Sequence, residues 1–97
     1  MISVRFLSPA HGEVADAAQT YLAESREVTS RFFDEVERVV DLIAANPNIG
    51  RPSNFDSRRV TLRRFPYDVV YRLVGIEAVI YAVAHHRRNP DYWVDRL

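Results

Sequence analysis

Four stretches of the chain have the apolar patterns expected for β-strands: apolar and polar residues alternate in the first three, and the last is a nearly continuous apolar run. The stretches are residues 2–7, 58–64, 67–74 and 77–85. Phe65-Pro66 follows the second stretch and predicts a turn, because proline has no amide to donate to a central ladder. Gly75 predicts a tight turn between the last two strands.

Apolar residues recur at helical spacing between the first and second strands, which predicts two helices. Ser8 is the expected cap of the first helix, and Pro9 is its expected first residue. Its apolar face comprises Val14, Ala17, Ala18, Tyr21 and Leu22. After a turn near Ser25, the second helix has an apolar face of Phe32, Phe33, Val36, Val39, Val40 and Ile43. The segment Asn46–Pro52 ends this helix, and residues 89–96 form a short helix or an extended tail.

The predicted element order is βααβββ. This order indicates an α+β fold in which a helical hairpin packs on a mostly antiparallel four-stranded sheet. A chain of 97 residues has the size of one domain, so residues 1–97 are expected to form a single domain.

Both faces of the last two strands carry apolar residues, although a helical hairpin covers only one face of a sheet. Strict alternation places one apolar set away from the helices: Val70, Val74, Ile80 and Ala82. Two covers are open at this point. The chain's own Tyr92, Trp93 and Leu97 could pack there, or a partner's helix or strand could lie in the groove.

The charged residues are segregated, although the net charge is zero. Residues 1–48 hold four arginines against eight acidic residues, and residues 49–97 hold nine against five. This segregation indicates an acidic helical surface and a basic sheet surface with different partners.

Several classes of function are not indicated. The chain has no cysteine, and its three histidines have no acidic residues at metal-ligand spacing, so we expect no disulfide and no metal site. It has no glycine-rich phosphate loop, and we expect no cofactor. No signal peptide and no membrane-spanning apolar run is evident, so a cytoplasmic protein without membrane contact is expected.

Four loose motifs occur in a fairly specific order. They are Asn46-Pro47-x-x-Gly50-Arg51-Pro52, Leu62-Arg63-Arg64-Phe65-Pro66-Tyr67-x-Val69-Val70-Tyr71-Arg72, Ala82-Val83-Ala84-His85 and Arg87-Arg88-x-Pro90-x-Tyr92-Trp93. With the opening strand and the helical hairpin, they resemble the RelE/ParE superfamily of toxins from type II toxin–antitoxin systems. The resemblance implies a complex with a cognate antitoxin whose C-terminal segment wraps the toxin. RelE-like members cut mRNA on the ribosome, and ParE-like members inhibit DNA gyrase by binding.

A metal-free nuclease needs a general base, a general acid and cations around the phosphate. If the chain is a nuclease, Arg59, His86 and Tyr92 are the expected catalytic residues. RelE-type nucleases resemble this chain less than ParE does. Two lysines of those nucleases are replaced by Arg59 and Thr61, and an arginine is replaced by Asp68, whose charge repels a phosphate. The comparison favours a ParE-like binding inhibitor with no catalytic residue, and the ribosome-dependent mRNA endonuclease is the alternative.

Two sets of contact residues follow. We expect a basic rim and the tail to bind the target, DNA gyrase: Arg59, Arg63, Arg72, Arg87, Arg88, Tyr92 and Trp93. We expect the second sheet face to bind the antitoxin: Val70, Arg72, Val74, Ile80 and Ala82. A third possibility is a toxin-like domain that binds antitoxin but poisons nothing.

Overall fold

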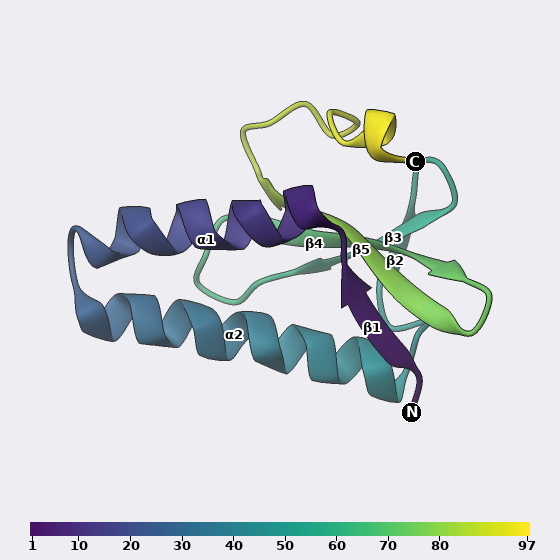
Figure 1. The fold of residues 1–97 in the computed structure, drawn as a ribbon, viewed down its shortest axis with the longest axis horizontal. Coiled ribbons are helices and arrows are strands. Elements are labelled where there is room, and N and C mark those ends of the chain that lie inside the picture. The colour runs from purple at the N-terminus through teal and green to yellow at the C-terminus, as the bar shows by residue number, and fades with distance from the viewer.

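A helical hairpin packs on one face of a five-stranded sheet in the computed structural model, which describes residues 1–97 (Figure 1). The elements are β1 (Ser3–Phe6), α1 (Ser8–Leu22), α2 (Arg26–Ala45), β2 (Arg51–Ser53), β3 (Ser57–Thr61), β4 (Tyr67–Val74), β5 (Glu77–His85) and the 3-10 helix η1 (Val94–Arg96). The strand order is β1-β5-β4-β3-β2. Only β1 pairs in parallel, with β5, so the sheet is mostly antiparallel and the predicted α+β fold is confirmed.

The sheet has one strand more than predicted. The three-residue β2 pairs with β3 across a turn in which Phe55 and Asp56 have positive φ angles. Pro52 is tolerated there because β2 is an edge strand. In contrast, β4 and β5 have the predicted boundaries.

The two helices begin differently. The expected cap at Ser8 is wrong: the helix begins at Ser8, and the capping position is Leu7, which has extended backbone and no side-chain cap bond. The second helix is capped by Ser25, whose Oγ accepts a hydrogen bond from the amide of Val28 at 3.3 Å. Neither helix has an apolar stretch long enough to cross a membrane.

The main core lies between the helices and the sheet. Phe32 and Ile43 of α2 pack there with Val69, Tyr71 and Ile80 of the sheet, all fully buried. Phe33 is 47% exposed, so its predicted place on the apolar face is wrong. One residue further along a helix is a rotation of about 100°, which turns Phe33 away from the core that Phe32 enters.

A β-bulge in β5 changes which residues face the helices. Val70 pairs with Ala82 and Tyr71 with Ile80, which leaves Tyr81 without a partner in β4. Tyr81 and Ala82 therefore both lie on the second face, while Ile80 packs in the helix-side core. The predicted grouping of Ile80 with Val70 and Ala82 is wrong, because it assumed strict alternation.

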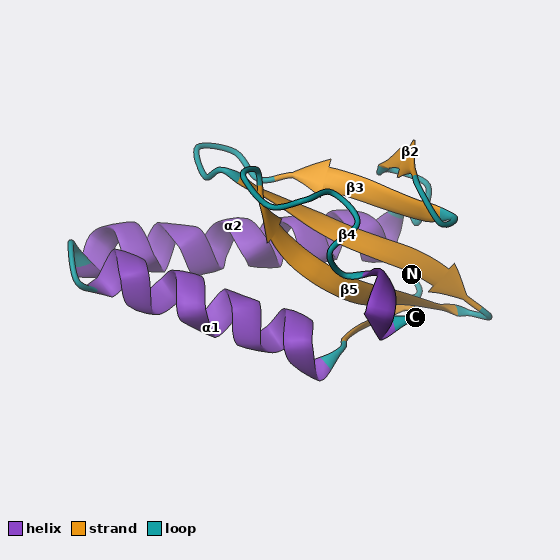
Figure 2. Ribbon diagram, turned by 90° about the horizontal axis from the view of Figure 1, so that it is seen from above, coloured by secondary structure: helices purple, strands orange, loops and turns teal.

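The C-terminal segment covers the second face of the sheet (Figure 2). Trp93 is fully buried there, in a cluster with Val70, Val79, Tyr81, Ala82 and Ala84. Its ring lies 5.7 Å from that of Tyr81. Of the two covers considered, the chain's own tail is the one found, although Leu97 remains exposed.

Candidate functional site: a cleft around Asp68

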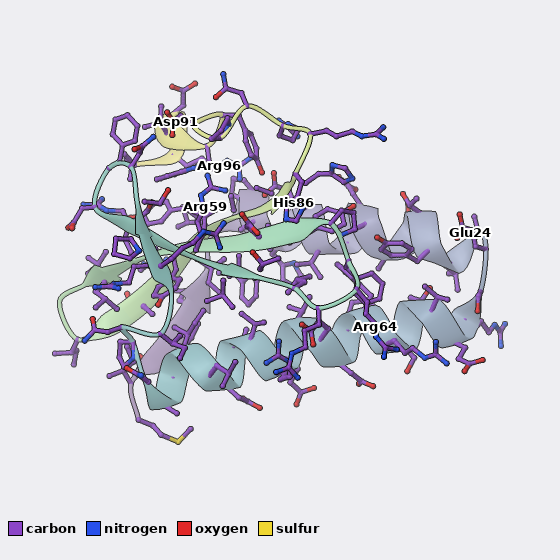
Figure 3. The ribbon with its side chains drawn as sticks, turned by 180° about the vertical axis from the view of Figure 1, so that it is seen from behind. Glu24, Arg59, Arg64, His86, Asp91 and Arg96 are labelled. Atoms are coloured by element: carbon purple, nitrogen blue, oxygen red, sulfur yellow. The ribbon has the colours of Figure 1, made fainter.

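A cleft of about 380 Å³ opens beside the ends of β3, β4 and β5. Its walls are predominantly basic: Arg51, Arg59, Thr61, Asp68, Ala84, His85, His86, Arg88 and Pro90. Figure 3 shows Arg59 and His86 near each other on this side of the molecule, with Arg64 well apart from them beside α2. The structure thus brings together two of the three residues expected for a nuclease.

Asp68 is the centre of the cleft. It lies opposite Thr61 in the β3–β4 register, and Thr61 donates a hydrogen bond to Oδ1 at 2.7 Å. His86 Nε2 lies 3.0 Å from the same oxygen. Arg51 and Arg59 donate to Oδ2 at 3.0 and 3.4 Å. The carboxylate is nearly buried, so these four side chains replace the water that it loses on folding.

The pKa of Asp68 lies below its ordinary value of 3.8. Burial alone would raise this pKa, but the hydrogen bonds from Thr61 and His86 and the charges of Arg51 and His86 outweigh the burial. The aspartate therefore stays ionised at neutral pH and neutralises part of the basic wall.

Because the pKa of Asp68 is depressed in the folded state, its ionised form stabilises the fold above the unfolded pKa. We expect the stability that Asp68 contributes to be constant near neutrality and to be lost as the pH falls from about 4 through the folded pKa. Urea unfolding of the wild type and of Asp68→Asn, measured from pH 7 to pH 2, tests this. The gap between the two free energies of unfolding should close at acid pH, and a pH-independent gap would contradict it.

All three nitrogens of the Arg59 guanidinium are already engaged within the chain. Its Nε donates to Ser53 Oγ at 3.2 Å, one terminal nitrogen contacts Asp68, and the other donates to the carbonyl of Pro90. The side chain is largely buried. Arg59 therefore joins the β2–β3 hairpin to the tail.

Tyr92 lies outside this cleft. It lines a neighbouring hollow of about 190 Å³ with Glu13, and its hydroxyl donates to Glu13 Oε2 at 2.6 Å. Burial and the Glu13 carboxylate raise the pKa of Tyr92, so the phenol stays protonated. The guanidinium of Arg88 stacks over its ring at 3.8 Å. Only Arg88 and His85 line both hollows, so the expected nuclease residues do not form one site.

Glu13 is a residue that the sequence reasoning missed. Its Oε1 accepts hydrogen bonds from the amide of Val83 at 3.0 Å and from Arg96 at 2.9 Å. Pairing of β1 with β5 ends at Ile80, so the amide of Val83 has no strand partner there. The available signal was an acidic residue in register with Ala17 on the buried face of α1. Glu13 therefore connects α1, the edge of β5 and the tail.

The expected basic rim is not one surface. Arg63 lies in the β3–β4 loop against α2, and Arg72 lies 4.0 Å from Asp56 and 6.0 Å from the ring centre of Tyr81. Arg87 and Arg88 are exposed on the segment after β5. The expected rim arginines therefore form no continuous surface, and the prediction of Trp93 as a target contact is wrong for this structure because its side chain is fully buried.

The expected antitoxin groove is not open in this chain. Val70, Ile80 and Ala82 are fully buried, the first and last beneath the tail and Ile80 beneath the helices. Only Val74 and part of Arg72 are accessible. The prediction of an open groove is wrong for two reasons, the bulge at Tyr81 and the insertion of Trp93, and antitoxin binding by these residues stays a prediction.

Solved structures of other proteins share the fold of this chain. No curated protein matches the sequence significantly. Among solved structures, the chromosomal ParDE system from P. aeruginosa matches with a TM-score of 0.77 and 24% identity over 88% of this chain and 96% of that one. The RelBE2 toxin–antitoxin complex from Mycobacterium tuberculosis matches with a TM-score of 0.58 and 20% identity over 87% of this chain and 96% of that one. A double arginine mutant of E. coli toxin RelE in the free state matches with a TM-score of 0.62 and 14% identity over 99% of this chain and 97% of that one.

These structural likenesses establish the fold, and the sequence carries the assignment further. Residues 4–90 match the family described as the ParE toxin of the type II toxin–antitoxin system parDE. The chain belongs to the ParE toxin family of type II toxin–antitoxin systems.

Proposed function

We propose that this ParE-family chain arrests growth by binding DNA gyrase in the cytoplasm and that a cognate antitoxin neutralises it. Gyrase comes from the family resemblance. The physical support concerns the mode of action, which we propose to be binding without cleavage of a substrate.

The observation that carries this proposal is the set of contacts around Asp68. Phosphate cleavage requires cations that are free to stabilise the charge of the transition state. Here the carboxylate of Asp68 already accepts hydrogen bonds from Arg51, Arg59 and Thr61 and contacts His86. A phosphate entering the cleft would have to displace an anion that is covalently part of β4.

The state of Tyr92 supports the same mode of action. Its proton is held by the carboxylate of Glu13, and the ring faces the neighbouring hollow. Tyr92 is therefore not available as an acid or base beside Arg59, and the other expected residue, His86, is engaged with Asp68. Among the expected target residues, Arg63, Arg87 and Arg88 are exposed, and their guanidinium groups donate no hydrogen bond to the rest of the chain.

An antitoxin partner is supported by two of the matched structures, whose descriptions name the ParDE system and a RelBE2 toxin–antitoxin complex. In this chain, Arg72 and Val74 are the expected antitoxin residues that remain accessible. We place the first antitoxin contacts there.

The test is to induce the chain alone and together with the antitoxin from the neighbouring reading frame. We expect growth arrest by the chain alone, loss of supercoiling by purified gyrase, intact mRNA, and rescue by the antitoxin. Arg87→Glu with Arg88→Glu should reduce toxicity without unfolding the domain. Cleaved transcripts with unaffected gyrase would instead indicate a RelE-like endonuclease, and normal growth with folded protein would indicate an inactive antitoxin-binding domain.

A further inference from the structure

A third and larger hollow, of about 480 Å³, lies between α2 and the loop that joins β3 to β4. It is separate from the Asp68 cleft and shares none of its residues. Its walls combine three basic, two apolar and one acidic side chain: Arg31, Arg63, Arg64, Val28, Phe65 and Glu35. We call it the α2–loop cleft.

Two of its arginines have no partner in the chain. The guanidinium groups of Arg63 and Arg64 make no hydrogen bond or ion pair, whereas Arg31 pairs with Glu27 on the surface. Most other arginines are engaged: Arg38, for example, forms two 2.8 Å hydrogen bonds with Glu35. The α2–loop cleft thus offers unused donors for an anionic group.

The loop that carries these arginines is held firmly. Leu62 is buried, and the ring of Phe65 packs edge-on against Tyr21 and Phe32, with centroids 5.1 and 5.3 Å away. The carboxylate of Glu35 also accepts a hydrogen bond from the amide of Arg63. Arg63 and Arg64 are therefore presented from a fixed backbone, which reduces the entropy lost when they bind.

Arg64 also adopts an unfavourable backbone conformation. Its φ angle is +67°, in the left-handed region where glycine is the preferred residue. Its side chain is exposed and makes no hydrogen bond or ion pair that would offset this strain. Strain of this kind concentrates at functional positions, which points to a use of the arginine outside the folded chain.

We propose that the α2–loop cleft is the docking site for an acidic segment of the toxin's target protein, with a carboxylate on Arg63 and Arg64 and an apolar side chain against Val28 and Phe65. This inference rests on the proposed function, in that it needs a protein target. The docked segment would be a small surface patch of the target that presents one acidic and one apolar side chain.

Charge and size select this occupant over two others. Nucleic acid is disfavoured because the five acidic residues of α2 beside the cleft outnumber its three arginines and repel a run of phosphates, whereas a single carboxylate needs only Arg63 and Arg64. An isolated hollow of about 480 Å³ accepts a few side chains, whereas a wrapping antitoxin segment needs a continuous groove. A local patch on a folded target fits both constraints.

The experiment compares the full chain with Arg63→Gln/Arg64→Gln and with Arg26→Gln. Arg26 is the matched control because it is exposed, unpaired and outside the cleft. We expect the double variant to need at least about tenfold more toxin for growth arrest and for gyrase inhibition. Its affinity for the antitoxin should stay within about twofold of wild type, and Arg26→Gln should match wild type throughout.

Arg64→Gly distinguishes a binding role from a structural one. Glycine relieves the backbone strain, so Tm should rise by on the order of 5 °C while toxicity falls. A fall in Tm would show a structural role and overturn the proposal, as would a double variant that remains fully toxic or that loses antitoxin affinity instead. Growth arrest by wild type without any effect on gyrase would contradict only the gyrase target. A wild type that arrests nothing would overturn both proposals.

Discussion

Replacing Trp93 with alanine is expected to lower the free energy of unfolding by about 3–5 kcal/mol. Trp93 is fully buried and covers Val70, Ala82 and Tyr81 on the face of the sheet that the helices leave open. Alanine would leave a cavity at the centre of this cluster and expose apolar strand residues. Because small domains are stable by about 5–15 kcal/mol, the loss is a large fraction of the total.

Urea unfolding followed by circular dichroism measures this change, with Leu97→Ala as the matched control. Leu97 belongs to the same tail but is half exposed, so its loss should change the free energy by less than about 0.5 kcal/mol. Increased binding of an apolar dye to Trp93→Ala would report the uncovered strands. A loss below about 1 kcal/mol would contradict the packing of the tail on the sheet.

The spacing of apolar residues predicts where the strands begin and end, but not which face of the sheet each side chain occupies. The boundaries of β4 and β5 follow from apolar spacing and turn residues, and the structure confirms both. The face of the sheet on which each β5 side chain lies does not follow from this spacing. Tyr81 has no partner in β4, so the residues before it and the residues from Ala82 onward do not keep one alternation. The bulge arises from the pairing of β5 with β4, and the apolar run of β5 by itself does not indicate it.

The residues of the candidate site could likewise be predicted only in part from the sequence. Asp68 is recognisable in the sequence as an anion among arginines, and the RelE comparison already made it unfavourable for phosphate binding. Its partners were only partly predictable. Arg51 reaches Asp68 from β2, a three-residue strand too short to produce an alternating pattern. The contact between Glu13 and Arg96 joins residues 83 positions apart, and nothing in local spacing indicates it.

The second large effect is expected at Glu13. Glu13→Gln should lower the free energy of unfolding by about 2–4 kcal/mol, because it removes the charge that Arg96 pairs with in a mostly buried setting. Arg96 holds both oxygens of Glu13, at 2.9 and 3.1 Å, and also donates to the carbonyl of Tyr81. Without the carboxylate, the guanidinium would remain only 20% exposed and without a counter-charge.

A double-mutant cycle of Glu13→Gln and Arg96→Gln measures the coupling, which we expect to exceed about 1 kcal/mol. The matched control is the Glu27–Arg31 pair of α2, whose side chains are 74% and 60% exposed. Solvent screening should hold its coupling below about 0.5 kcal/mol, although it too joins one glutamate to one arginine. Equal coupling in the two cycles would mean that burial of Glu13 adds nothing to the ion pair. Coupling confined to the Glu13 cycle would mean that a charged contact on α1 holds the tail in addition to the packing of Trp93 on the sheet and the hydrogen bond from Arg59 to Pro90.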